Sequence, residues 1–302
     1  MQPANHDTIL SDLEIRAEPF ALCALEGACS LGLGRNSGAA LHYVLEGSGA
    51  LSFPAHPALP LTPGRLVLVP ASVRHSLNND GRGKTTVPAC APAGLDLDEH
   101  LARGDGAGRM LVLCSTVQLS LRNTHGLVDL LRAPLSLDTG QAPVAGQAIK
   151  ALLHEMRTPR AGRKAMIRLL ILQCVTEMLR TRLEAGDPMV LWLTGLADPG
   201  LWQALRAMLD DPGAPHTVDS LSDTAGMSRS RFAERFQGAY GHAPMTFLRQ
   251  LRLARAAQLL VDGQVPVKQV ARTVGFTSRS AFTRAFADAW GQPPGVFRRA
   301  AT

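Results

Sequence analysis

One pattern occurs twice near the C-terminal end of this 302-residue chain, and the two copies are 50 residues apart. Each copy begins with Ser-Arg-Ser, continues with three aromatic residues spaced four apart, and closes with a Gly followed three residues later by a Pro. Such a repeat fixes the architecture of its region, because both copies are expected to fold in the same way. The matching positions are Ser228, Arg229, Ser230, Phe232, Phe236, Tyr240, Gly241 and Pro244, and Ser278, Arg279, Ser280, Phe282, Phe286, Trp290, Gly291 and Pro294.

Each copy is predicted to form one short amphipathic helix. Aromatic residues at i, i+4 and i+8 share a helical face, Ser is a preferred N-cap, and Gly commonly ends a helix. An apolar-periodic segment closed by Gly and an apolar residue precedes each copy, at 218–227 and 267–276. This order is the helix-turn-helix pattern, whose second helix can enter a major groove. The alternative is a pair of hairpins in an ordinary α-helical domain, but two copies in one register favour helix-turn-helix units.

The helix face opposite the aromatic residues carries the side chains expected to meet DNA. They are short polar and Arg side chains, the types that contact base edges and phosphates. The second helix is the stronger predicted reader, because Ala233 offers only a methyl group and Glu234 is acidic. With the capping serines, the predicted DNA-binding residues are Ser228, Arg229, Ser230, Ala233 and Glu234, and Ser278, Arg279, Ser280, Thr283 and Arg284.

The repeat region resembles the DNA-binding domain of the AraC/XylS family of bacterial transcription regulators over residues 198–299. The resemblance implies two helix-turn-helix units, joined by a helix at about 244–260, that enter successive major grooves of double-stranded promoter DNA. About 17 residues at ~1.5 Å rise give ~25 Å, which is compatible with the ~34 Å repeat of DNA. The residues that carry the resemblance are Gly226 to Arg229, Phe232, Phe236, Gly241 to Pro244, Leu251 to Ala256, Val274 to Phe276, Phe282 to Phe286, Pro294, Phe297 and Arg298.

The basic charge of the chain is concentrated in the same region. Residues 216–302 hold twelve Lys and Arg against five Asp and Glu, so they carry +7, whereas residues 1–215 carry −1. A basic face is often only solvated surface, but a polyanion partner explains this uneven placement. No apolar run approaches the ~20 residues needed to cross a bilayer, and residues 1–13 do not resemble a signal peptide. We therefore expect a cytoplasmic protein without membrane contact.

Residues 20–121 are predicted to form a β-barrel or sandwich, because short apolar runs alternate there with Gly, Pro and Asn. The runs 38–49 and 63–79 resemble the two motifs of the cupin barrel, in which His and Glu from facing strands can converge on a metal.

His42, Glu46 and His75 fall on metal-ligand positions of the cupin pattern, and two His with one carboxylate suit a divalent metal. The pattern's first His is replaced by Ala40. A His on a strand is more often a packed residue than a ligand, so a barrel without metal remains open.

The cupin region is also similar to a subgroup of these regulators that includes reactive-chlorine-sensing activators. In that subgroup a cysteine of the first strand and one of a late strand respond to hypochlorous acid, and Cys23 and Cys114 match those places. A second thiol is useful because it rescues a sulfenic acid as a disulfide. The alternative is simple packing, since cysteine is among the most buried residue types. Cys90, between two prolines, is a reserve partner thiol.

Two helices are predicted after the barrel, at 144–156 and 163–184. The second has a broad apolar surface, which either packs on the barrel or, as in similar regulators, forms a homodimer interface. The predicted domains are a cupin-like sensor barrel at 1–140, a helical dimerisation and linker segment at 141–186, and the double helix-turn-helix domain at 187–302.

The sequence thus predicts an α+β protein with a cupin-like β-barrel and an all-α domain of two helix-turn-helix units. We expect a regulator, not an enzyme, that binds promoter DNA, meets RNA polymerase and responds in its barrel to oxidation or a small ligand. One alternative is a metal-dependent cupin enzyme fused to a DNA-binding domain, whose turnover would need stoichiometric metal. Another is a constitutive DNA-binding protein, whose binding would not change with any signal.

Overall fold

The computed structural model describes residues 10, 13–33, 38–53, 57–71, 73–79, 85–87, 98–121, 124–125, 133–158, 160–187, 190, 192–263 and 265–299. Two compact units make up the chain. One consists of residues 15–118 and 133–181, and the other of residues 1–14, 119–132 and 182–302. None of the helices in the described ranges is both long enough and apolar enough to cross a membrane.

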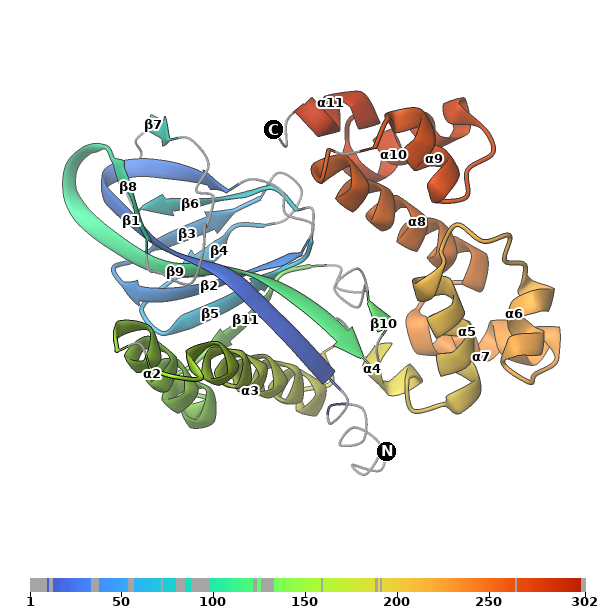
Figure 1. The fold of residues 1–302 in the computed structure, drawn as a ribbon, viewed down its shortest axis with the longest axis horizontal. Helices are drawn as coiled ribbons and strands as arrows, with labels where there is room; N and C mark the ends of the chain where they lie inside the picture. Colours follow the sequence, from blue (N-terminus) through green and yellow to red (C-terminus); the bar gives the residue numbers. More distant parts are fainter. Residues whose placement is uncertain are drawn as a thin grey trace. The chain divides into compact units, whose positions relative to one another are not determined.

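The β-rich unit contains two sheets that share one long strand, β1 (Leu13–Leu33). The first sheet runs in the order β11-β5-β2-β9-β1, and the second continues as β1-β6-β3-β4 (Figure 1). Strands β7 and β8 also pair with β1, and β10 pairs with β9. The bounds are β2 Ala39–Glu46, β3 Gly49–Ser52, β4 Leu59–Leu61, β5 Arg65–Val69, β6 His75–Asn79, β7 Thr85–Val87, β8 Asp98–Arg103, β9 Asp105–Leu121, β10 Thr124–His125 and β11 Leu135–Asp138.

Strand β1 passes from one sheet to the other at Gly27. This residue has φ 69°, a conformation that Gly adopts without the steric cost of a Cβ atom. The side-chain amide of Asn79 stabilises this turn in β1 by donating a hydrogen bond to the Gly27 carbonyl at 2.9 Å. Because the strand turns here, apolar side chains from both sheets meet in one interior. That core includes Cys23, Leu25, Leu31, Val44, Leu51, Leu61, Val67, Leu77, Met110, Val112 and Cys114.

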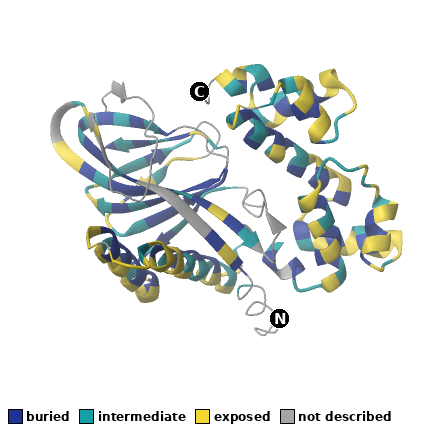
Figure 2. Cartoon of the chain, in the orientation of Figure 1, coloured by how far each residue is buried: buried dark blue, intermediate teal, exposed yellow. Residues whose placement is uncertain are grey.

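Helices α2 (Pro143–Arg157) and α3 (Arg163–Glu184) follow strand β11. Their contact includes the Cys174 thiol, which lies 3.9 Å from the Ala145 carbonyl. Both helices also carry exposed surface (Figure 2). Met166 and Leu169 of α3 are 46% and 59% exposed, so part of its apolar surface is not buried within the chain. The homodimer interface on α3 remains a prediction.

The second unit is helical from residue 192 onward, and its two helix-turn-helix units flank the long helix α8 (Pro244–Val261). The 50-residue sequence repeat is also seen in how the aromatic rings pack, because each copy has an equivalent ring contact. Phe236 lies 5.3 Å from Phe247 between ring centroids, and Phe286 lies 5.0 Å from Phe297. All four rings are buried. The remaining helices are α4 Trp192–Gly195, α5 Pro199–Asp210, α6 Val218–Thr224, α7 Arg229–Tyr240, α9 Val267–Thr273, α10 Arg279–Trp290 and α11 Pro294–Arg299. The predicted fold class is confirmed.

The predicted ends of the recognition helices α7 and α10 also occur. Gly241 and Gly291 end the two helices in the left-handed conformation, with φ 74° and 71°. Ser278 accepts a hydrogen bond from the Ala281 amide at 3.4 Å. Ser228 occupies the N-cap position of α7, but its side chain makes no capping hydrogen bond with the described residues. The capping bond expected at Ser228 is therefore missing.

One arginine of α8 connects the two helix-turn-helix units. The Arg252 guanidinium donates to the carbonyls of Pro212 at 2.7 Å and Ala214 at 2.8 Å, just before α6. It also donates to the Gly275 carbonyl, at 3.4 Å, in the turn between α9 and α10. Arg presents several donors in a rigid plane, so it can satisfy acceptors from both units at once.

The two helix-turn-helix units also touch through their backbones beside Arg252. A Cβ atom on Gly213 would lie 2.1 Å from the Thr273 carbonyl oxygen, and one on Gly275 would lie 2.7 Å from that of Gly213. Distances below 3.0 Å are too short for real carbon contacts. Gly275 moreover has φ 79°, where other residues are strained. Both glycines are therefore required for this close approach.

We expect Arg252→Ala to destabilise the DNA-binding unit by about 2–3 kcal/mol, because three charge-assisted hydrogen bonds to partly buried carbonyls are lost. Urea unfolding followed by tryptophan fluorescence measures this unit selectively, since all three tryptophans, Trp192, Trp202 and Trp290, lie in it. Arg249→Ala, at an exposed position of the same helix, is the control and should change stability by less than about 0.5 kcal/mol. Equal stability of the two variants would contradict the role of Arg252.

Candidate nucleic-acid interface and sensor core

The two recognition helices bury their aromatic faces and expose their polar faces. Phe232 and Phe236 of α7 and Phe282 and Phe286 of α10 are fully buried. Most of the residues predicted to bind DNA lie on the opposite, solvent-facing side. Ser228, Arg229, Ser230, Glu234, Ser278, Arg279, Ser280 and Arg284 are exposed, and Ala233 and Thr283 are intermediate. Their accessibility suits contacts to DNA, while the aromatic residues anchor each helix.

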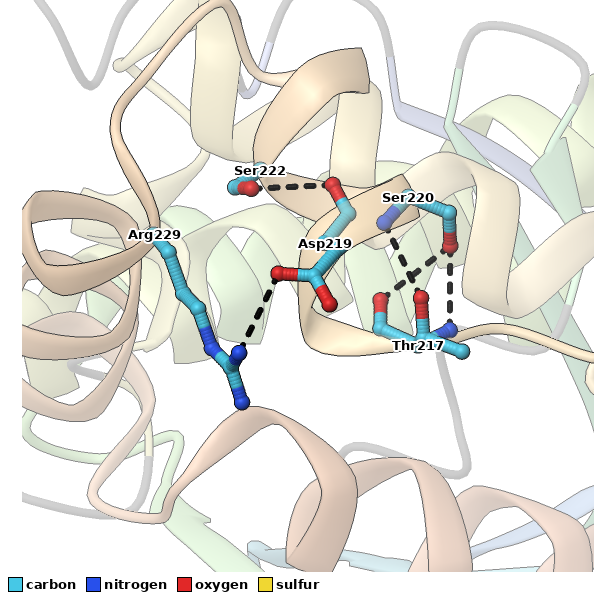
Figure 3. A network of polar contacts seen from close by, with 5 residues as sticks. All are labelled: Thr217, Asp219, Ser220, Ser222 and Arg229. Atoms are coloured by element: carbon cyan, nitrogen blue, oxygen red, sulfur yellow. Dashed lines mark hydrogen bonds and ion pairs between the residues drawn. The ribbon is translucent and has the colours of Figure 1, made fainter.

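Two of the three arginines of α7, Arg229 and Arg235, form ion pairs within the protein. The Arg229 guanidinium lies 3.4 Å from the Asp219 carboxylate of α6 (Figure 3). Both side chains are about two-thirds exposed, so this ion pair is weak and open to exchange with a phosphate. Arg235 makes a closer pair, 2.6 Å, with Asp198, whose other carboxylate oxygen accepts from two amides at the start of α5.

Helix α6, which carries Asp219, has a reciprocal cap at its start (Figure 3). The Thr217 hydroxyl accepts from the Ser220 amide at 3.1 Å, and the Ser220 hydroxyl accepts from the Thr217 amide at 3.0 Å. Such a capping box satisfies amides that the helix itself leaves unpaired. The cap therefore fixes the helix start from which Asp219 reaches Arg229.

The arginines of α10 differ from Arg229 and Arg235. Arg279 and Arg284 make no ion pair with any residue in the described part of the chain, and both are exposed. Their donors are available without breaking an existing pair. This agrees with the interpretation that the second recognition helix is the stronger base reader.

In the barrel, two predicted residues meet across the interior. His42 belongs to β2 of the first sheet and His75 begins β6 of the second. Their Nε2 atoms are 2.8 Å apart, and the ring centroids are 5.0 Å apart. Cys114 of β9 pairs with His42 in the β2–β9 register, and its Sγ lies 3.2 Å from His42 Nδ1. Finally, His75 Nδ1 lies 2.9 Å from the Val73 carbonyl oxygen.

This polar chain is buried in an apolar core, which determines the protonation of the two rings. Burial above all, and then the adjacent His75, lower the pKa of His42 well below its ordinary value of 6.5. Burial lowers the pKa of His75 to about 4, although the Val73 carbonyl opposes this change. Both imidazoles are therefore neutral at neutral pH.

Glu46 does not join the two histidines. The β2–β9 register shifts between Val44 and Glu46, so the regular alternation that would place Glu46 on the face of His42 is interrupted. The Glu46 side chain is 61% exposed and lies 3.9 Å from Arg109. Among the described residues there is no cluster of three His, Cys, Asp or Glu that could hold a metal. The predicted ligand set therefore does not fit a metal centre: the two Nε2 atoms face each other, and the carboxylate points elsewhere.

The two predicted redox cysteines lie in the same core. Cys23 of β1 is 0% exposed and Cys114 of β9 is 3% exposed. Both are thiols here. Strands β1 and β9 are hydrogen-bonded neighbours. The reserve residue Cys90 lies outside the residues that the structure describes.

Two sequence families match the chain. A family described as "Cupin" covers residues 7–184, more than half of the chain, and a family described as "Helix-turn-helix domain" covers residues 221–300. The chain belongs to the AraC-type regulators with a cupin domain. Its helix-turn-helix domain binds DNA, and its cupin domain is the effector domain.

Curated relatives span most of this regulator. It is 26% identical to the HTH-type transcriptional regulator AlkR of Acinetobacter baylyi, over 96% of this chain and 97% of AlkR. It is 29% identical to the RCS-specific HTH-type transcriptional activator RclR of Escherichia coli, over 85% of this chain and 83% of RclR. A putative AraC-like transcription regulator of Streptomyces lividans is 36% identical over 54% of each chain. These relatives are transcription regulators, so the cupin-enzyme alternative is set aside.

Several residues of these sites were not predicted from the sequence. Val73 contacts His75 through its backbone carbonyl, and a backbone contact cannot be recognised from the residue type. The contact between His42 and Cys114 depends on which strands pair and in which register, and strand periodicity alone does not give this. Asp219 and Arg252 are charged residues in helices, and only the three-dimensional arrangement of the helices distinguishes them from ordinary surface charges.

We expect the barrel to lose stability as the pH falls from about 6.5 towards 4. In this window the unfolded chain binds a proton at residue 75 and the folded chain does not, so protonation favours unfolding. For His75 alone, the difference between 6.5 and about 4 corresponds to roughly 3 kcal/mol of stability present above pH 6.5 and lost by pH 4. NMR titration of the folded protein checks the cause directly: His75 should titrate near 4. A midpoint near 6.5 for His75 would contradict it.

Proposed function

We propose that this protein is a promoter-binding regulator whose barrel senses oxidation through Cys23 and Cys114. In the proposed mechanism, oxidation changes the barrel, and this changes how the DNA-binding unit engages promoter DNA and RNA polymerase. A homodimer through α3 is part of the proposal, supported by the exposed Met166 and Leu169. A solution mass equal to one 32.2-kDa chain, on and off DNA, would exclude the dimer.

The observation that carries the proposal is the position of Cys114. Its thiol contacts an imidazole nitrogen at 3.2 Å, and Cys23 belongs to the same core cluster. The two cysteines lie on neighbouring strands of one sheet, β1 and β9. A disulfide between the two cysteines would also take Cys114 out of its hydrogen bond to His42. Oxidation would thus alter the packing of both sheets at the centre of the core.

One relative supports the same signal. RclR is named as an activator specific for reactive chlorine species, and the similarity to it extends across most of both chains. For a signal of this kind to regulate, the oxidised and reduced barrels must favour different states of the whole regulator. A reversible disulfide meets this requirement, because it stabilises only a barrel in which the two sulfurs are bonded.

For promoter recognition we propose that α10 provides most of the base reading. Ser278, Arg279, Ser280, Thr283 and Arg284 form its outer face, and neither arginine is held by an ion pair within the described residues. On α7, the corresponding face contains the acidic Glu234 and an arginine already paired with Asp219. Contacts of α7 to the phosphate backbone, through Arg229 and the serines, would fix the register rather than read sequence.

We expect Arg279→Ala and Arg284→Ala each to weaken specific promoter binding by ~1–3 kcal/mol, provided that the arginine contacts a guanine through two hydrogen bonds. Fluorescence anisotropy with the specific fragment and a scrambled fragment, at one fixed salt concentration, separates specific from general binding. Arg206→Ala on α5, whose side chain is paired with Asp210, is the control for loss of a positive charge and should bind normally. Unchanged affinity in both α10 variants would remove α10 as the main reader.

We expect hypochlorous acid to change the footprint of the purified protein on its own upstream DNA, and a thiol reductant to restore it. Cys23→Ser and Cys114→Ser should each abolish the change and still bind DNA when reduced. Cys174→Ser is the matched control, because Cys174 is also buried but lies on α3. Non-reducing peptide mapping should find Cys23 joined to Cys114. A footprint that is identical with and without oxidant would instead indicate a small-molecule signal or constitutive binding.

A further inference from the structure

The ion pair between Arg229 and Asp219 is replaced by two cations in the second helix-turn-helix unit. Helices α6 and α9 have the same length, and both begin with Val and end with Thr, so their positions correspond. Asp219, the second residue of α6, corresponds to Lys268 of α9. Arg229 and Arg279 each begin a recognition helix. The corresponding side chains of the second unit therefore repel each other, whereas those of the first unit attract.

The two helix-turn-helix units also differ in total charge. Residues 218–240, from the start of α6 to the end of α7, contain three Arg and three Asp or Glu, so their net charge is zero. Residues 267–290, from the start of α9 to the end of α10, contain four Lys and Arg against one Asp, so they carry +3. Binding that does not depend on DNA sequence comes from contacts of Lys and Arg with phosphates. The second unit is therefore attracted to any duplex more strongly than the first.

The carboxylate of Asp219 is not part of the cap that begins α6. That cap joins Thr217 to Ser220, and Ser222 donates to the backbone carbonyl of Asp219 at 2.9 Å (Figure 3). The Asp219 side chain instead lies 3.4 Å from the Arg229 guanidinium, and both side chains are about two-thirds exposed. A carboxylate and a phosphate accept the same charge-assisted hydrogen bonds from a guanidinium. Asp219 therefore occupies the donors that Arg229 needs for a DNA phosphate.

We propose that Asp219 competes with DNA phosphate for Arg229 and so weakens the sequence-independent attachment of the first helix-turn-helix unit. Asp219 is thus a positioning residue, which affects DNA binding only through Arg229. The second unit has Lys268 at the corresponding place, so its attachment is not reduced in this way. This inference rests on the proposed contact of Arg229 with the DNA backbone. It adds the reason why two copies of one motif bind a duplex with unequal strength.

The test compares Asp219→Asn with the unmodified full-length protein on a scrambled duplex, by fluorescence anisotropy between roughly 50 and 200 mM salt. Asn has nearly the same shape as Asp but no charge. We expect the variant to bind several-fold more tightly at the lowest salt concentration. The plot of log affinity against log salt concentration should become steeper by about 0.9, which is the contribution of one additional phosphate contact. Urea unfolding checks that the variant is folded.

Asp223→Asn is the matched control, because it removes the same charge from another exposed position of α6, and Arg229 is paired with Asp219. Its salt dependence should stay close to that of the unmodified protein. Asp219→Glu keeps the carboxylate and should restore the original slope. In an Arg229→Ala background, Asp219→Asn should have no more effect than Asp223→Asn. A purely structural role of Asp219 would not make the slope depend on Arg229.

Equal slopes for Asp219→Asn and Asp223→Asn would overturn the competition, because a general loss of negative charge would explain both. Weaker binding by a folded Asp219→Asn protein would also overturn it, since the ion pair would then hold Arg229 where DNA needs it. Tighter binding that persists without Arg229 would show that the proposed phosphate contact itself fails. The scrambled duplex makes the test independent of base reading. If the α10 variants bind the specific fragment normally, base reading by α10 fails while the result for Asp219 stands.

Discussion

The arrangement of the DNA-binding unit depends on one half-buried guanidinium. The side chain of Arg252 projects from α8, the helix between the two helix-turn-helix units, and donates to carbonyls of both units. Burial lowers the pKa of this arginine, but the group stays charged, and its charge is offset by the carbonyl dipoles and by Asp211. Lysine could not replace it, because a single ammonium cannot reach acceptors spread over a planar fork. The two recognition helices are therefore oriented by hydrogen bonds as well as by hydrophobic packing.

The barrel differs from the DNA-binding unit, because the polar groups at its centre are uncharged. A buried polar side chain must be hydrogen-bonded, and the two histidines satisfy this requirement with each other, a thiol and a carbonyl. A bound metal would have required both Nε2 atoms and a nearby carboxylate, but Glu46 leaves the interior at a strand irregularity. The same fold position can thus hold an ion or a chain of hydrogen bonds, depending on whether a third ligand faces inward. Here the third group that faces inward is a thiol.

Much of this architecture could be predicted from residue patterns that are local. The repeat at residues 228 and 278, the aromatic spacing and the glycine helix ends all depend on contacts within a few turns, and the structure contains them. The missing capping bond of Ser228 could not be predicted in this way, because Ser228 and Ser278 begin the same Ser-Arg-Ser pattern and only Ser278 caps its helix. The candidate sites were harder to predict. Placing His42 against Cys114 requires the pairing of strands that are 72 residues apart in sequence, and the register shift that displaces Glu46 has no sequence signal of its own.

The contact between Gly213 and Gly275 separates two properties that a regulator of this kind must control. The side chains proposed to meet bases lie on exposed faces of α7 and α10, whereas the close approach of the two helix-turn-helix units is made by bare backbone at Gly213 and Gly275. Surface substitutions on α10 can therefore alter the proposed base-reading face without changing how the two helix-turn-helix units pack. A side chain at either glycine would do the reverse, because it would push the two helix-turn-helix units apart and leave the exposed faces of α7 and α10 as they are.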